Sequence, residues 1–448
     1  MNYSNDQLQA LRDIEDFLHD NDQRAYVLTG HAGTGKTTIV RHICETIHRH
    51  TPFDLRLSAT THKASKVLSK VLGDTVHTIH SLLGLRPAGV DKFGNQIFKA
   101  SKTKDLWIRT VVIVDEASMI DQNLLQLIAT KAKEEKAKIL FVGDPYQLPP
   151  IKSRCAVFDN SLPTSKLSTI HRQYAQSPIV VEAEKYRAFL QNDKLPFPTL
   201  ENNLHKGEGV HLLDKKAFMQ KLMAEYNNFI EGDTVNTAVC TYTNKAAIHY
   251  NQMIRKRIHF MEPTLKPYYP GEVLVAAAPY LLQGKVAINN DASVRVIEDV
   301  TSTASSPLFA TLPDVPTRQL KIHNGKSSLT VKVTTSPEKL EKAIKEMKDK
   351  ALTAQRQLKN IPRSDSSAYF HADKQRKTAW ATYYTFKDSF ADLRSPYAGT
   401  THKAQGSTYE RVYIDLADIQ RCTVASTRAR LLYVALTRAS DDVFICIN

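Results

Sequence analysis

The most specific spacing of chemically useful residues lies near the amino terminus. Residues 30–37 read GHAGTGKT and fit the pattern GxxxxGK[ST], between an apolar run and a segment with helical periodicity. Glycines at these positions let the backbone curl so that successive N–H groups point inward, next to the positive end of a helix dipole. Such a loop binds phosphates, with Lys36 reaching the β- and γ-phosphates and Thr37 ligating Mg²⁺. The predicted nucleotide-binding residues are Gly30, Gly33, Thr34, Gly35, Lys36, Thr37 and Thr38.

Two adjacent carboxylates follow another apolar run. Residues 110–118 read TVVIVDEAS, which puts Asp115 and Glu116 near the carboxyl end of a predicted buried strand. In parallel sheets that edge is where ligands bind. Asp115 is predicted to hold Mg²⁺ through water, and Glu116 to orient or deprotonate an attacking water. Adjacent carboxylates also flank surface turns, but the apolar run and the loop at 30–37 favour the catalytic interpretation.

The elements that must position these residues alternate between helices and strands. Apolar residues at helical spacing predict a helix over 5–20. Apolar runs predict strands at 25–30, 55–60, 110–118, 138–144, 234–243, 411–416 and 442–447. Alternation of this kind is typical of parallel sheets covered by helices. The predicted fold class is α/β, with two parallel-sheet domains that each carry an insertion.

Two stretches interrupt this alternation. Residues 84–105 are rich in Gly, Lys and turn formers, and the string KFGNQIFK predicts a hairpin with Gly94 and Asn95 at its turn. The periodicity also changes after Pro263. There the predicted elements are short strands over 271–300, a polar loop over 301–319 and an exposed helix over 336–358.

Composition narrows the class of protein. At about 100–200 residues per domain, 448 residues allow two to four domains. The net charge of +14 favours a polyanionic partner, although a solvated basic surface has the same composition. Five scattered cysteines without a CxxC pair exclude a disulfide framework and a cysteine zinc site, and suit a reducing cytoplasm. The acidic start is unlike a signal or transit peptide, and no apolar run is long enough to span a membrane.

Several classes of nucleotide hydrolase do not fit. Residues 244–247 read NKAA and lack the Asp of the guanine motif NKxD, which argues against GTPases. The chain contains no SGGQ signature of ABC-type ATPases. The acidic pair continues as DEAS rather than DEAD or DEAH, which argues against the second helicase superfamily.

The remaining motifs resemble those of superfamily 1 helicases, in the RecD-like branch that includes small bacteriophage enzymes. The resemblance covers nearly the whole chain, with the motifs in order. They are ATTHKA at 59–64, TIHSL at 78–82, GDPYQLPP at 143–150, HRQ at 171–173, TYTNK at 241–245, THKAQGS at 401–407 and LYVALTRA at 432–439. GDPYQLPP and THKAQGS are the most specific, whereas TIHSL alone is a weak signal.

The resemblance implies roles at the nucleotide. Gln7 stands where the family reads adenine, and Gln147 where it senses the γ-phosphate. Arg172 and Arg438 become arginine fingers that approach the γ-phosphate from opposite sides of a cleft. Arg172 could instead be a surface residue, and His171 could stack on adenine or be structural. ATP and Mg²⁺ are the implied cofactors.

The resemblance also implies a path for single-stranded DNA. Hydroxyl and lysine side chains contact phosphates without reading sequence. The implied contacts are Thr60, His62, Lys63, Thr241, Asn244, Lys245, Thr401, His402 and Lys403. Trp380 and Tyr384 are the preferred base-stacking pair in the aromatic stretch 379–390, although a stripe at helical spacing is more often core. Phe98 corresponds to the family's aromatic at the duplex fork, with Phe93 as the alternative, although hairpin aromatics often pack locally.

The implied organisation is two RecA-like motor domains with insertions. The first domain is 1–83 and 106–183, with a pin-like hairpin at 84–105; the second is 184–258 and 394–448, with a β-rich SH3-like insertion and helical extension at 259–393. Where the family has Asn-Asn-Gly before a strand, residues 289–291 read NND. Asp tolerates positive φ better than most residues, so this turn is expected to survive.

The predicted function is an ATP-dependent DNA helicase that translocates on single-stranded DNA and unwinds forked duplex DNA. A 5′→3′ direction follows from the branch resemblance alone. The alternative is a non-unwinding, DNA-binding ATPase that strips proteins or acts as a subunit of a complex. The expected setting is a monomer in the cytoplasm, that of the host if the chain is phage-encoded. Its expected partners are a single-stranded-DNA-binding protein or other replication and recombination proteins.

Overall fold

The computed structural model describes most of the chain. The described residues are 3–90, 96–100, 107–150, 153–159, 161–170, 177–227, 236–259, 266–282, 285–300, 315–362 and 364–447, with the backbone alone at 86–90, 96–100 and 285. Four predicted site residues or turns fall wholly or partly outside this set. Phe93, the turn at Gly94 and Asn95, and Arg172 with its neighbour His171 are not described, and for Phe98 only the backbone is.

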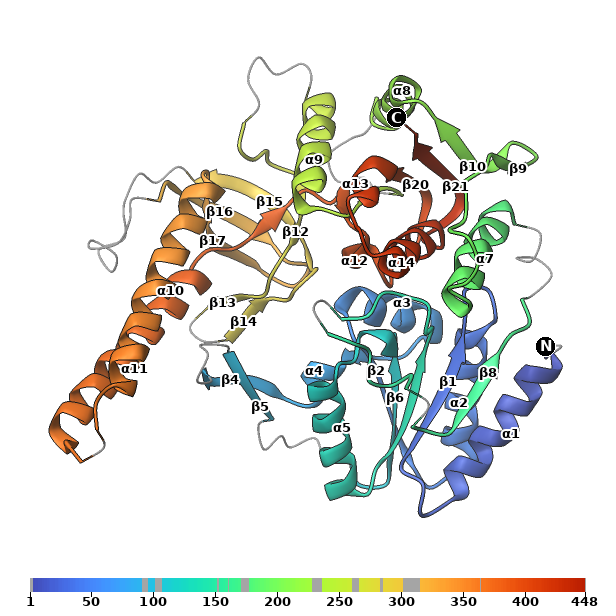
Figure 1. Ribbon diagram of the computed structural model, residues 1–448, viewed down its shortest axis with the longest axis horizontal. Helices are drawn as coiled ribbons and strands as arrows, with labels where there is room; N and C mark the ends of the chain where they lie inside the picture. Colours follow the sequence, from blue (N-terminus) through green and yellow to red (C-terminus); the bar gives the residue numbers. More distant parts are fainter. Residues whose placement is uncertain are drawn as a thin grey trace.

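The amino-terminal part forms a six-stranded parallel sheet in the order β3-β2-β6-β7-β1-β8 (Figure 1). Its strands are β1 (Ala25–Gly30), β2 (Asp54–Ala59), β3 (Val76–Thr78), β6 (Thr110–Asp115), β7 (Lys138–Gly143) and β8 (Thr164–Leu167). Its helices are α1 (Asn5–His19), α2 (Lys36–His50), α3 (His62–Leu72), α4 (Ile79–Leu82) and α5 (Gln122–Glu135), with a 3₁₀ turn at Ala117–Met119.

Alternate residues of the central strand β6 point to opposite faces of this sheet. Val111 and Ile113 pack with the apolar faces of α1 and α2, whereas Val112 and Val114 pack with α4 and α5. Helices therefore cover both faces, which explains why the strands read as continuous apolar runs. The predictions of a helix over 5–20 and of strands at 25–30, 55–60, 110–118 and 138–144 are confirmed to within a few residues.

A second six-stranded sheet has the order β19-β11-β20-β21-β10-β9, and only β9 runs antiparallel to its neighbour. Its strands are β9 (Asn203–His205), β10 (Glu208–Leu213), β11 (Thr237–Thr241), β19 (Ala398–Thr400), β20 (Tyr409–Asp415) and β21 (Ala439–Cys446). Its helices are α7 (Pro178–Gln191), α8 (Lys215–Glu225), α9 (Asn244–Ile258), α12 (Thr401–Ala404), α13 (Leu416–Gln420) and α14 (Ala425–Leu436). Helices α7 and α14 pack on one face, and α8 and α9 on the other.

The segment between α9 and β19 forms a separate antiparallel sheet in the order β17-β16-β15-β12-β18. Its strands are β12 (Val273–Ala276), β15 (Ser293–Val300), β16 (Thr317–His323), β17 (Ser328–Thr334) and β18 (Leu393–Arg394), beside the two-stranded β13 (Tyr280–Leu282) and β14 (Lys285–Ile288). Strand β16 begins at Thr317, so the end of the predicted loop over 301–319 is strand instead. Asp291, in the turn before β15, has φ of 57°, as expected for the NND departure.

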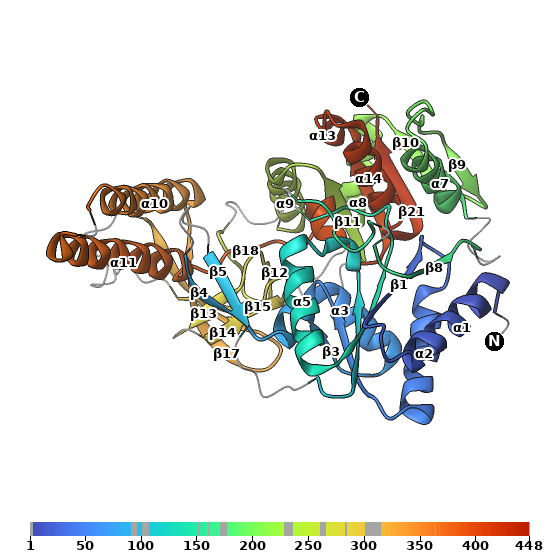
Figure 2. The ribbon, with the colours of Figure 1, turned by 60° about the horizontal axis from the view of Figure 1, so that its bottom comes forward.

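Two hairpins project from these sheets. The helical arm consists of α10 (Pro337–Lys359) and α11 (Ser366–Asp388), which pack side by side and extend away from both parallel sheets (Figures 1 and 2). Strands β4 (Leu85–Val90) and β5 (Gln96–Ala100) pair as an antiparallel hairpin, as predicted for this region. In both views this hairpin lies on the side of the first sheet that faces the antiparallel sheet. In the described part of the chain, no helix combines the length and apolar character of a membrane span.

Candidate nucleotide and nucleic-acid site

The loop at residues 30–37, here called the phosphate loop, joins β1 to α2. Gly33 and Gly35 have φ of 79° and 80°, which is the left-handed region that glycine adopts without strain. A Cβ on Gly30 would lie 2.5 Å from Thr34 Oγ1, so a larger residue there would displace the Thr34 side chain. Lys36 Nζ donates to the carbonyl oxygens of Gly30 at 2.7 Å and His31 at 3.0 Å. The loop thus curls around its own lysine, in the form that binds phosphates.

Gln7 supports the base of this loop from the first turn of α1. Its side-chain oxygen accepts from the backbone N–H of Ser4, which completes a capping box at the start of the helix. Its amide nitrogen donates to Thr34 O at 3.0 Å, and the side chain is 1% exposed. Gln7 therefore links α1 to the phosphate loop. Both polar atoms of its amide are bonded within the protein, and its contact with adenine stays a prediction.

The acidic pair lies at the carboxyl end of β6. Asp115 Oδ1 accepts from the backbone N–H of Glu116 at 2.8 Å, and Glu116 has a left-handed backbone with φ of 54°. Burial raises the pKa of Asp115. Burial and the neighbouring Asp115 raise the pKa of Glu116 to about 7, against the opposing charges of Arg438 and Lys36. A pair of carboxylates with raised pKa values would gain from a bound cation, so this donor set fits a divalent metal.

The two parallel sheets meet across the loop that follows β7. Gln405, from the THKAQGS string, donates to Gln147 Oε1 at 2.8 Å and to Ser118 Oγ at 2.9 Å. Arg430 on α14 donates to the carbonyl oxygens of Pro145 at 2.5 Å and Gln147 at 2.7 Å. Residues of the second sheet therefore hold Gln147, and Gln405 also bonds to Ser118, two residues after Glu116.

Arg438 comes from the second sheet and lies at this boundary. It is 8% exposed, and its guanidinium donates to the carbonyl oxygens of Val434 at 3.2 Å and Ser407 at 3.1 Å. Its charge stabilises the ionised form of Glu116 across the boundary. The structure thus brings Arg438 together with Lys36, Asp115 and Glu116, whereas Arg172, the other predicted arginine, lies outside the described residues.

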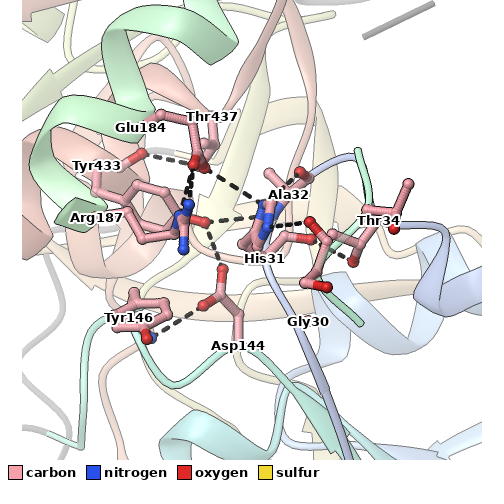
Figure 3. Close-up of polar contacts among 12 residues, drawn as sticks. Gly30, His31, Ala32, Thr34, Asp144, Tyr146, Glu184, Arg187, Tyr433 and Thr437 are labelled. Carbon is pink, nitrogen blue, oxygen red and sulfur yellow. Dashed lines mark hydrogen bonds and ion pairs between the residues drawn. The ribbon is translucent and has the colours of Figure 1, made fainter. Parts of the chain in front are cut away.

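Contacts that the sequence did not predict surround the phosphate loop. The hydroxyl of Tyr433 donates to Asp144 and accepts from the backbone N–H of Ala32, and His31 Nδ1 lies 3.4 Å from Glu184 on α7 (Figure 3). Tyr433 and Gln405 stand inside recognisable motif strings, so a signal existed for them. Glu184 and Arg430 lie outside any motif, and only the packing of α7 and α14 identifies them.

Several predicted DNA contacts gather where the second sheet, α3 and the antiparallel sheet meet. Lys63 Nζ on α3 donates to Lys403 O at 3.1 Å. A cavity of about 70 Å³ is lined by residues that include Lys63, Asn244, Lys403, Arg394 and Asp291. Burial lowers the pKa values of His62 and His402, so both imidazoles are mainly neutral at neutral pH. Asn244 and Lys245 are exposed at the start of α9.

Two predicted DNA contacts face inward instead. Thr241 and Thr401 are each 0% exposed, at the ends of β11 and β19. Thr401 Oγ1 donates to Thr241 O at 3.2 Å, and Thr241 Oγ1 donates to Thr243 O at 3.0 Å. Both hydroxyls are therefore engaged by backbone carbonyls inside the protein. Thr60 Oγ1 likewise donates to Glu116 O at 3.1 Å, although Thr60 is only partly buried.

The aromatic stretch at 379–390 is also mainly core. Trp380 is 3% exposed, and its indole N–H donates to Gln355 Oε1 on α10 at 2.9 Å. Tyr384 is partly buried and stacks on Trp380, with ring centroids 6.0 Å apart. The proposed pair of base-stacking rings is therefore wrong for Trp380, because the contact between α10 and α11 covers its ring.

A resident metal cluster is not apparent in the described residues, where no group of three or more His, Cys, Asp or Glu side chains is arranged to hold an ion. A metal at the acidic pair would therefore need ligands from the nucleotide or water, as is usual for Mg²⁺.

Comparison with known proteins identifies the class of this chain. Protein-family models match as an AAA domain over residues 2–192 and as a UvrD-like helicase C-terminal domain over residues 396–446. The chain is 28% identical to the ATP-dependent DNA helicase dda of Enterobacteria phage T4 over 434 residues, which cover 93% of each protein. It is 36% identical to the ATP-dependent RecD2 DNA helicase of Deinococcus radiodurans over 163 residues, covering 36% of this chain and 21% of that protein.

A solved structure of the Pif1 helicase from Candida albicans aligns with 100% of this chain and 95% of that chain, at 17% identity and a TM-score of 0.47. The two parallel sheets, with a phosphate loop on one and an arginine from the other, define a P-loop protein built on RecA-like sheets. More narrowly, the chain is similar to the superfamily 1 helicases of the RecD and Dda type.

Proposed function

We propose that this protein is an ATP-dependent DNA helicase that translocates on single-stranded DNA and unwinds duplex DNA. The observation that carries the proposal is that side chains of the second sheet bond to the phosphate loop and to the loop after β7, while the charge of Arg438 acts on Glu116. A nucleotide bound there contacts both sheets, so its hydrolysis changes how strongly they associate. The relatives named as ATP-dependent DNA helicases support the same activity.

The residues of the first sheet supply the nucleotide-binding half of the proposed site. Lys36 binds the β- and γ-phosphates, Gln7 contacts the adenine, and Thr37 with Asp115 holds Mg²⁺, which neutralises phosphate charge when bound. Glu116 orients the attacking water and accepts its proton. The other proposed nucleotide contacts are the backbone groups of Gly30, Gly33, Thr34, Gly35 and Thr38.

The second half of the proposed site senses the γ-phosphate. Arg438 stabilises charge that develops on the transferring phosphoryl group, Gln147 contacts the same group, and Arg172 adds a second positive charge. Gln147 is held by Gln405 from the opposite sheet, so its position depends on how close the sheets are. This dependence supports a cleft that closes on ATP and reopens after hydrolysis.

For the DNA path, we propose the partly exposed residues around α3, α9 and α12. These are His62, Lys63, Asn244, Lys245, His402 and Lys403, which lie on both sides of the sheet boundary. When residues on both sides of the sheet boundary bind the same DNA strand, each cycle of cleft opening and closing can move the protein along that strand. A 5′→3′ direction is proposed from the resemblance to the RecD-like branch.

The proposed domain division follows the sheets except at its boundary after residue 183, which divides α7 although the whole of that helix packs on the second sheet. The first motor domain comprises 1–83 and 106–183, and the second comprises 184–258 and 394–448. The β4–β5 hairpin within 84–105 acts as a pin at the duplex fork, and 259–393 is an inserted SH3-like sheet with the helical arm. Pairing of β4 with β5, and the five antiparallel strands, support these two assignments.

The experiment that tests the function compares two variants in ATP hydrolysis and in unwinding of a forked duplex. Lys36→Ala should abolish hydrolysis and leave single-stranded DNA binding largely intact, because the phosphate loop lies apart from the proposed DNA path. Glu116→Gln should bind ATP and hydrolyse it slowly, because it removes the proton acceptor and keeps the side-chain shape. Wild-type turnover in purified Lys36→Ala would rule out the proposed ATP site. Hydrolysis without unwinding by the wild-type protein would favour the non-unwinding ATPase.

A further inference from the structure

The hydroxyl of Tyr433 bridges two loops of the first sheet from a helix of the second. It donates to Asp144 Oδ2 at 2.6 Å and accepts from the backbone N–H of Ala32 in the phosphate loop at 3.3 Å. Tyr433 lies on α14 and is 1% exposed (Figure 3). One side chain therefore joins the loop after β1 and the loop after β7 to the opposite sheet.

The buried side chain of Asp144 needs the Tyr433 hydroxyl as a hydrogen-bond donor. Asp144 is 0% exposed, and its other oxygen accepts from the backbone N–H of Tyr146 at 2.9 Å. A buried carboxylate is costly unless hydrogen bonds compensate it, and Tyr433 supplies the bond to Oδ2. Burial and the charge of Asp144 raise the pKa of Tyr433 well above its ordinary value, so its hydroxyl keeps its proton and stays a donor.

The same helix positions the arginines of the boundary. Arg430 lies three residues before Tyr433 on α14 and donates to the carbonyls of Pro145 and Gln147, in the loop that carries Asp144. Arg438 follows shortly after the end of α14 at Leu436 and acts on Glu116. Because a helix is a rigid element, the bond from Tyr433 to Asp144 helps to fix how close Arg438 comes to Glu116.

The phosphate loop has a second anchor on this side. His31 Nδ1 lies 3.4 Å from Glu184, and Glu184 also pairs with Arg187 on α7. Helix α7 packs against α14 in the core of the second sheet. Two adjacent loop residues, His31 and Ala32, are therefore held by elements that belong to the other sheet.

We infer that Tyr433 is a positioning residue that couples closure of the two sheets to the shape of the phosphate loop. In the closed arrangement its hydroxyl satisfies Asp144 and orients the Ala32 peptide, while Arg438 is brought to Glu116. When the sheets separate, both bonds break, and water takes over the Ala32 N–H and the Asp144 carboxylate. The inference rests on the proposed ATP hydrolysis. It makes Tyr433 the residue whose hydrogen bonds form when the two sheets close and break when they separate.

The test is Tyr433→Phe, which keeps the buried ring and removes the hydroxyl. We expect kcat for DNA-stimulated ATP hydrolysis to fall by about tenfold, because the closed arrangement loses two hydrogen bonds. The dissociation constant of ADP, measured with a fluorescent ADP analogue, should change by less than about twofold, since the phosphate loop itself still binds phosphates. A solely structural role would instead lower the melting temperature and weaken ADP binding together.

Tyr413→Phe is the matched control. Tyr413 is 0% exposed, and its hydroxyl donates to a carboxylate, Glu225 Oε1, at 3.0 Å, entirely within the second sheet and its helix α8. Its kcat should stay within about twofold of wild type, since no bond across the boundary is lost. An equal fall in kcat for Tyr413→Phe would overturn the inference.

Asp144→Asn gives an independent measurement from the other side of the bond. The double variant Asp144→Asn, Tyr433→Phe should have a kcat no lower than that of the more damaging single variant. The reason is that both changes disrupt the same bond between Tyr433 and Asp144. Additive losses, or wild-type kcat in Tyr433→Phe, would overturn the inference. These outcomes leave the proposed function intact, whereas wild-type turnover in Lys36→Ala would remove the function itself.

Discussion

Glu116 shows how one residue combines an unusual backbone with an unusual acidity. Its left-handed conformation turns the chain sharply after β6, so that the side chain leaves the sheet edge beside Asp115. Burial and the charge of Asp115 then raise its pKa to about 7. A general base is most effective when its pKa lies near the working pH. The environment of Glu116 therefore suits the proposed proton acceptor.

This pKa predicts an acid limb in the pH profile of ATP hydrolysis. Below about pH 7 Glu116 of the free enzyme is increasingly protonated and cannot accept a proton, so kcat/KM for ATP should fall about tenfold per pH unit. The measurement is kcat/KM at saturating single-stranded DNA from about pH 5.5 to 8.5, with circular dichroism to verify folding. A flat profile across neutral pH in folded protein would contradict this assignment.

At the scale of elements, the helical arm owes its form to a small apolar seam. Ala343, Met347 and Ala351 of α10 face Trp380 and Tyr383 of α11. The long charged residues of both helices project outward, which explains why the sequence of α10 reads as an exposed helix. The arm can thus hold its shape away from the parallel sheets.

Substitution of Trp380 should therefore lower the stability of the helical arm and leave the affinity for single-stranded DNA unchanged. Trp380→Ala should cost about 3–5 kcal/mol of local stability, because it empties the largest side chain of the seam. Hydrogen exchange across α10 and α11 measures that loss, and the affinity for single-stranded DNA should remain within about twofold. Thr382→Ala, at an exposed position of α11, is the control. A large loss of DNA affinity in a folded Trp380→Phe would restore the base-stacking role.

A change in the β4–β5 hairpin should distinguish strand separation from translocation. Phe98 lies on β5, opposite Pro87 on β4. Stacking of a base on an aromatic ring is worth about 1–3 kcal/mol, comparable to one base-pair step, so Phe98→Ala should strongly lower duplex unwinding. DNA-stimulated ATP hydrolysis should stay near wild type. Equal loss of both activities would make Phe98 a folding residue, and loss of neither would point to Phe93 or another group.

At the scale of the whole molecule, the two parallel sheets are joined by specific hydrogen bonds from the second sheet to loops of the first. Gln405, Arg430 and Tyr433 supply them, and all end on loops next to the phosphate loop or on it. Such a polar boundary opens at lower cost than an apolar one, because water can replace its hydrogen bonds. This boundary suits the proposed cleft that opens and closes with the nucleotide, and the net charge of +14 suits a polyanionic partner.

Binding of single-stranded DNA should accordingly weaken steeply with salt. The logarithm of the association constant should fall with the logarithm of salt concentration, with a slope of about −0.7 for each phosphate neutralised. Titrations of a fluorescent oligonucleotide at several salt concentrations give the slope, and Lys63→Ala should make it shallower by roughly one phosphate. Salt-independent binding, or strong preference for one base sequence, would contradict a path that follows the backbone.

The sequence by itself determined the parts of this protein that depend on local chemistry. Glycine spacing specified the phosphate loop, because only glycine adopts the φ values of Gly33 and Gly35 without strain. Continuous apolar runs specified the central parallel strands, because helices cover both faces of the sheet. The positive φ of Asp291 was likewise foreseeable, since Asp is among the residues that tolerate it.

Only the tertiary structure decided which side chains of each motif face outward and which residues outside the motifs join them. Thr241 and Thr401 belong to motif strings, as Asn244 and Lys403 do, yet their hydroxyls donate to backbone carbonyls inside the protein. Tyr433 reaches the phosphate loop across nearly the whole length of the chain. Such contacts depend on how the two sheets pack together, and the spacing of residues along the sequence does not determine that packing.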